Sequence, residues 1–135
     1  MVRQATLEDI FGPAVYVYTR RQAIADGVLV DVTDAAREAG FRIPVAVTQA
    51  VHAEYVDCDE DLRAQGQDPD GRLWDILWMC RMAIAASRTN GRELLFPVLV
   101  MMEAGKEAET VTLKAHCGPG DDGEPVLTIM KPNED

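Results

Sequence analysis

The residues that come closest to a chemical motif are four aspartates in one polar stretch. Asp57, Asp59 and Asp61 alternate along the chain, and Asp68 completes a spacing that resembles the oxygen ligands of a calcium loop. Such a loop needs glycine at its sixth position and a bidentate glutamate at its twelfth. The chain has Leu62 at the sixth position and an aspartate at the twelfth. We therefore interpret the stretch as a solvated loop and predict no metal site there.

A second candidate is the glycine-rich stretch at residues 118–125. It holds Asp121, Asp122 and Glu124, and these carboxylates would repel a phosphate group. A divalent cation held by the three carboxylates stays open as an alternative. The preferred interpretation is a β-hairpin turn, in which glycine supplies a positive φ and aspartate tolerates one.

Nucleophiles and histidines are scarce in this chain. His116 and Cys117 are adjacent, but neighbours on a strand point to opposite faces, so the pair would not share a proton. His52 and His116 belong to no zinc-binding pattern. Ser87 is the only serine and lies in no nucleophile motif. We expect no catalytic residue, no cofactor and a protein that is not an enzyme.

Cysteine usage and hydropathy indicate a cytoplasmic protein. Cys58, Cys80 and Cys117 are an odd number without CxxC spacing, which fits a reducing compartment better than a disulfide framework. Cys80 lies in an apolar run and is expected to be an inert core thiol. Every long apolar run is interrupted before about 18 residues, so we expect no membrane-spanning helix.

The chain is strongly acidic, and its charge is uneven. It has 13 Lys and Arg against 23 Asp and Glu, a net charge of −10. Residues 54–75 contain eight acids and two arginines, and residues 121–135 contain five acids and one lysine. Such a chain would repel nucleic acid and attract a basic protein surface. We expect the negative charge to gather at one end of the domain.

The residues predicted to contact a basic partner all carry carboxylates. They are Asp57, Asp59, Glu60, Asp61, Asp68, Asp70, Asp121, Asp122 and Glu124.

A different set of side chains would line a ligand pocket in the alternative interpretation. Trp74 and Trp78 lie one turn apart on a predicted helix, a pattern more typical of a core than of a pocket. Tyr18, Arg20 and Arg21 form an aromatic and basic cluster whose guanidinium groups could hold an acidic ligand. The alternative function is therefore a small-ligand or divalent-metal-binding domain built on these five residues.

These side chains would be positioned by a single α+β domain spanning residues 1–135. We expect an antiparallel sheet of 3–5 strands packed on a buried Trp-containing helix, with several short helices. The helical patterns lie at residues 7–11, 20–26, 35–39, 49–55 and 72–87. The extended patterns lie at residues 28–32, 41–47, 93–102, 110–116 and 125–130. Residues 57–71 are expected to form a loop.

Three stretches together resemble a known family. They are residues 18–51, residues 71–79 (GRLWDILWM) and residues 111–135 (VTLKAHCGPGDDGEPVLTIMKPNED). They are similar to an uncharacterised family of small proteins, a domain of unknown function found in bacterial chromosomes, plasmids and phages. The resemblance implies a bacterial, often mobile-DNA setting, and it brings no assigned activity or catalytic residue.

Together these features predict a non-enzymatic acidic interaction protein that binds a basic host protein surface. In a mobile-element setting, that surface would include defence or nucleic-acid-binding machinery; this step rests on analogy alone. No direct nucleic-acid or membrane contact is expected. A homo-oligomer that pairs sheet edges near residues 98–102 is a further alternative.

Overall fold

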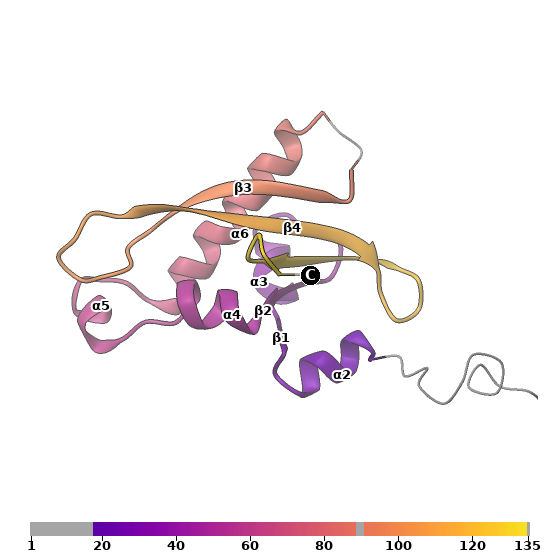
Figure 1. The fold of residues 1–135 in the computed structure, drawn as a ribbon, viewed down its shortest axis with the longest axis horizontal. Coiled ribbons are helices and arrows are strands. Elements are labelled where there is room, and N and C mark those ends of the chain that lie inside the picture. Colours follow the sequence, from indigo (N-terminus) through magenta and orange to yellow (C-terminus); the bar gives the residue numbers. More distant parts are fainter. Residues whose placement is uncertain (1–17, 89–90, 135) are drawn as a thin grey trace, which may run out of the picture.

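The computed structural model describes residues 18–88 and 91–134, and a five-stranded mixed sheet lies at its centre (Figure 1). The sheet order is β1-β2-β5-β4-β3. All neighbouring strands are antiparallel except β2 and β5, which run parallel. The strands are β1 (Leu29–Asp31), β2 (Val45–Thr48), β3 (Glu93–Val100), β4 (Glu109–Pro119) and β5 (Pro125–Met130). The predicted α+β class is confirmed, as is the antiparallel pairing of the last three strands.

One long helix and several short ones accompany the sheet. They are α2 (Arg20–Ala25), α3 (Thr33–Glu38), α4 (Gln49–Val51), the π-helical turn η1 (His52–Val56), α5 (Glu60–Ala64) and α6 (Pro69–Ala86). The helix expected at residues 7–11 lies outside the described residues. Among the helices of the described ranges, none is both long enough and apolar enough to cross a bilayer.

The expectation of a loop over residues 57–71 was wrong. Asp59 caps α5 by accepting a hydrogen bond from the Leu62 amide at 2.8 Å. Asp68 caps α6 in the same way, with the Gly71 amide at 2.6 Å. Pro69 does not oppose this helix, because the first helical position needs no amide donor. Two helix starts therefore lie in a stretch whose glycine, proline and acidic content is typical of a loop.

The hydrophobic core lies between α6 and one face of the sheet, and Figure 1 shows α6 crossing β3 and β4. The sheet contributes Phe96, Leu113 and Ile129, and α6 contributes Ile76 and Leu77; all five are buried. This packing confirms the predicted contact between the sheet and the tryptophan-containing helix.

The expectation that the two tryptophans of α6 belong to the core was wrong. Trp74 and Trp78 each keep 40% of their surface exposed. The helix carries apolar residues almost all round, but it buries only the sides that face the sheet, α3 and η1. No described element covers its outer side.

The opposite face of the sheet is partly covered by α2. The Arg20 side chain donates from Nη1 to Thr128 Oγ1 at 2.7 Å, and Thr128 points away from the core face of β5. Lys114 of β4 lies on this same face and is only 9% exposed. Its Nζ donates to the Glu134 carbonyl at 2.6 Å and lies 4.0 Å from Glu93 Oε1. These contacts explain how a lysine can be buried on this face.

Candidate functional site

Most of the predicted acidic residues lie in one part of the structure, which is joined together by the buried side chain of Arg72. Its Nε donates to the Tyr55 carbonyl at 2.8 Å, and its Nη1 donates to the Met101 carbonyl at 2.7 Å. Arg72 is only 5% exposed. These bonds join residues 54–75 to the connection between β3 and β4. We call residues 54–75 and 101–109 together the acidic end.

The acidic end holds most of the charge of the chain. Residues 54–75 have a net charge of −6. Residues 101–109 contain three glutamates and one lysine, which adds −2 and gives −8 of the total −10. The sequence pattern did not indicate the contribution of residues 101–109, because those residues lie within residues 76–120, a stretch with a net charge of +1. A glutamate-rich hairpin connection was the signal that could have pointed to them.

The six predicted acids of the acidic end divide into two groups by their local role, whereas Glu54 and Glu103 of the same region form ion pairs with Lys131 and Lys106. Asp59 and Asp68 are engaged as helix caps. The others are exposed and make no hydrogen bond or ion pair with the described residues; they are Asp57, Glu60, Asp61 and Asp70. The last three lie in the first turns of α5 and α6, where the helix dipole favours negative charge. The fold therefore presents unpartnered carboxylates on ordered helix starts.

Two of the three predicted acids in the turn between β4 and β5 are engaged within the protein. Asp121 accepts hydrogen bonds from the Arg20 amide at 2.7 Å and the Arg21 amide at 3.0 Å. These bonds hold the pKa of the Asp121 carboxyl below its usual value. Glu124 accepts from the Asp122 amide at 3.0 Å. The turn thus secures the start of α2.

This turn also lies far from the acidic end, so the expectation that all the excess charge gathers at one end was wrong. Figure 1 shows α5 and the β4–β5 turn at opposite ends of the long axis of the molecule. The physical reason is the length of β4, whose 11 residues at about 3.3 Å each separate the connections at its two ends by roughly 30 Å.

The five side chains of the predicted ligand pocket do not come together. Arg20 docks on the face of the sheet opposite α6, where Nη2 also donates to the Leu127 carbonyl at 2.9 Å. Partial burial lowers the pKa of its guanidinium. Tyr18 donates to Asp26 at 2.5 Å, and Arg21 stays exposed on α2. The tryptophans lie across the sheet, on α6.

The two tryptophans form an exposed apolar surface beside the acidic end. Their rings stack with centroids 5.9 Å apart and an interplanar angle of 12°. Next to them, a shallow groove of about 550 Å³ runs between α6 and the open edge of β3, where Leu99 is 65% exposed. Asp75 and Thr110 also line this groove, so it adjoins the acidic end. An aromatic centre with a charged rim is the usual composition of a protein-binding surface.

The structure offers little support for metal or thiol chemistry. Within residues 18–88 and 91–134, no three His, Cys, Asp or Glu side chains converge on a possible metal position. The Cys80 thiol is fully buried, and burial raises its pKa to about 12. The interpretation of Cys80 as an inert core thiol is therefore confirmed.

One of the three comparisons with known proteins found a match. Neither the curated proteins nor the solved structures yielded a match. One protein-family model matches residues 9–135, which is nearly the whole chain. The chain therefore belongs to DUF6573, a family of unknown function.

Proposed function

We propose that this chain is a non-enzymatic protein-binding domain that receives a basic protein at its acidic end. The observation that carries the proposal is the net charge of −8 over residues 54–75 and 101–109, beside two stacked and exposed tryptophans. The charge would steer a basic partner and speed the encounter. The tryptophans would supply the apolar centre of the contact, because buried Trp side chains often carry most of an interface's binding energy.

Local order at the acidic end favours tight binding. Arg72 and the capping side chains of Asp59 and Asp68 hold the backbone in place before any partner arrives. A surface that is already ordered loses less conformational entropy on binding. The unpartnered carboxylates can therefore contact Lys or Arg side chains without a rearrangement of the fold.

The charge at this surface favours a different protein over a second copy of the chain. Two acidic ends brought face to face would repel each other, and salt would weaken that repulsion only in part. A homo-oligomer joined along β3 stays an alternative, since β3 has only β4 beside it in the sheet of the described residues. Sedimentation at two protein concentrations separates a monomer from such an oligomer.

The cellular setting forms part of the proposal. The bacterial, plasmid and phage context comes from the sequence resemblance, and the three free cysteines fit a reducing cytoplasm. A host protein that itself binds nucleic acid, such as a component of defence machinery, presents the basic surface that the acidic end requires. Direct contact of this chain with nucleic acid is not part of the proposal, because phosphate would be repelled.

The test compares two triple variants with equal loss of charge. The acidic-end variant combines Asp57→Asn, Glu60→Gln and Asp61→Asn, which leaves both helix caps intact. The control combines Asp34→Asn, Glu38→Gln and Asp122→Asn, three exposed acids outside the acidic end. A partner is captured from nuclease-treated host extract, purified, and its dissociation constant for each form is measured at low and moderate salt.

The acidic-end variant should bind about tenfold more weakly, mainly through slower association, because each exposed ion pair contributes about 0.2–1 kcal/mol. The control should bind as the unmodified protein does. Trp78→Ala should weaken binding by about thirtyfold or more through faster dissociation. Equal affinities for the two triple variants at low salt would overturn the proposal.

A further inference from the structure

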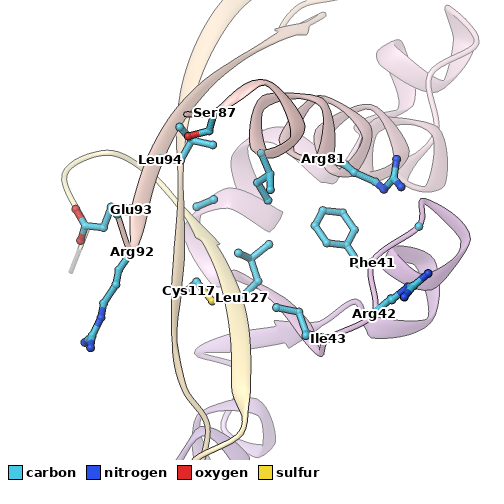
Figure 2. A pocket seen from close by; sticks show the side chains of 14 residues that line it. Phe41, Arg42, Ile43, Arg81, Ser87, Arg92, Glu93, Leu94, Cys117 and Leu127 are labelled. Atoms are coloured by element: carbon cyan, nitrogen blue, oxygen red, sulfur yellow. The ribbon is translucent and has the colours of Figure 1, made fainter. Parts of the chain in front are cut away.

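A second cavity, at the other end of α6, differs from the acidic end in its charge. It has a volume of about 350 Å³, and its apolar walls include Phe41, Ile43, Leu94 and Leu127 (Figure 2). This volume is at the lower end of the range for ligand pockets, roughly 300–1,000 Å³. The hydrophobic core is thus open at this end, between the sheet, α6 and the segment that joins α3 to β2.

Three arginines lie around this cavity in a chain that is otherwise strongly acidic. Arg42, Arg81 and Arg92 all line it, and Glu93 is the one carboxylate among its lining residues. Glu93 reaches toward Lys114 on the other face of the sheet, at 4.0 Å. Among the described residues, no carboxylate lies within ion-pair distance of the three arginines.

Two of these arginines lie on the same side of the cavity. Figure 2 shows Arg42 and Arg81 on the same side of the cavity, with Phe41 between them in this view, while Arg92 extends away. Arg81 packs so closely on Gly40 that a Cβ added there would lie 2.5 Å from Arg81 Nε. Gly40 also has a φ of +103°, which favours glycine. The turn at Gly40 therefore brings Arg42 and Arg81 to the same side of the cavity.

From this geometry we propose that the cavity binds a small organic anion, with an apolar or aromatic body against Phe41 and Leu127 and its anionic head between Arg42 and Arg81. Guanidinium groups bind carboxylate and phosphate heads through charge-assisted hydrogen bonds, often two at a time. The apolar walls would contact the body of the ligand, and the unpaired arginines would bind its anionic head. This site is independent of the proposed partner surface.

Matched probes separate the contributions of head and body. Naphthalene-2-carboxylate and 2-naphthyl phosphate carry both parts, naphthalene-2-carboxamide lacks the charge, and inorganic phosphate lacks the body. Isothermal titration calorimetry on the full chain should detect binding of the two naphthyl anions, at least tenfold tighter than the carboxamide or inorganic phosphate. Whichever naphthyl anion binds more tightly identifies the head group.

Arginine variants test the position of the head. Arg81→Gln and Arg42→Gln should each weaken the binding of the tighter-binding naphthyl anion by about tenfold or more. Arg63→Gln, which removes the same charge from an exposed position in α5, should leave its affinity unchanged. Because Arg42 is exposed, its replacement keeps the test valid even if Arg81→Gln fails to fold.

The cysteines report where the probe binds. Cys117 lines the cavity, whereas Cys58 lies at the acidic end, and both are half-buried. Alkylation by iodoacetamide, followed by mass spectrometry of the peptides, should slow at Cys117 and not at Cys58 when the naphthyl anion is present. Four outcomes would overturn the proposal: no binding by either naphthyl anion at millimolar concentration, equal binding of the carboxamide, unchanged affinity in both arginine variants, or a Cys117 rate that the bound anion does not alter.

Discussion

Replacing Arg72 with methionine should destabilise the protein strongly, because this side chain joins the segments of the acidic end. The substitution keeps a long apolar stem and removes two short hydrogen bonds, to the carbonyls of Tyr55 and Met101. A hydrogen bond with a charged donor contributes about 1.5–3 kcal/mol when buried. We therefore expect a loss of about 3–6 kcal/mol in the free energy of unfolding.

Thermal unfolding followed by circular dichroism measures this loss. For 135 residues the entropy of unfolding is about 0.28 kcal/mol per kelvin, so the midpoint should fall by roughly 10–20 °C. The control is Arg63→Met, an exposed arginine of the neighbouring helix α5, which should change the free energy of unfolding by no more than about 0.5 kcal/mol. If both variants unfold at the same temperature, Arg72 does not hold the acidic end together.

Four further predictions follow from individual contacts. Asp68→Ala should cost about 1 kcal/mol in urea unfolding because the cap of α6 is lost, whereas Asp68→Asn should keep most of that stability; equal losses would contradict the cap. Burial raises the pKa of Cys80 from 9.0 to about 12. Between pH 9 and pH 12 the unfolded chain therefore loses the thiol proton while the folded protein keeps it. The free energy of unfolding should fall by about 1.4 kcal/mol per pH unit over that range. Cys80→Ala should lack that slope in urea titrations across the same range, and an unchanged slope would contradict the burial of the thiol. Because the pKa of Asp121 is lowered in the folded protein, its contribution to stability is present at neutral pH and is lost as the pH falls through that lowered pKa. The amide signals of Arg20 and Arg21 in NMR spectra should therefore shift during acid titration. The same shifts in Asp121→Asn would show that another group is responsible. Finally, Gly40→Ala and Gly27→Ala should each lower the free energy of unfolding by about 1–2 kcal/mol, because both positions have a left-handed backbone. Only Gly40→Ala should move the NMR signal of Arg81 Nε–H, because a Cβ at Gly27 would meet open space.

Local signals in the sequence were sufficient for most of the secondary structure. The helix expected at residues 20–26 is found as α2, where Thr19 caps the start and Gly27 follows the end with a φ of +78°. The extended patterns at residues 93–102, 110–116 and 125–130 located β3, β4 and β5, whose antiparallel pairing follows from the short connections between them. These elements depend on residues close together in the chain, so the sequence alone could locate them.

Features that depend on distant contacts could not be predicted in the same way. The parallel pairing of β2 with β5 joins Val45 to Leu127, and nothing local indicates it. The exposure of Trp74 and Trp78 depends on which side of α6 faces the sheet, and a helix that is apolar almost all round does not reveal this.

The candidate site was only partly predictable for a similar reason. The acids of residues 57–70 were identified, because they are consecutive in the sequence. Arg72 was not, although it holds the acidic end together, because its carbonyl partners at Tyr55 and Met101 carry no side-chain signal. The cavity near Phe41 was also missed, since Arg42 and Arg81 come to line one cavity only through the packing of α6 near the segment after α3.

The most direct test of the proposed function is a hydrogen–deuterium exchange footprint of the full chain bound to its captured, purified partner. Amides within residues 57–79 and 101–109 should exchange more slowly in the complex, and α2 and the β4–β5 turn should exchange as in the isolated protein. Protection confined to α2, the β4–β5 turn or the cavity around Phe41, with residues 57–79 unchanged, would contradict the assignment of the acidic end as the partner-binding surface.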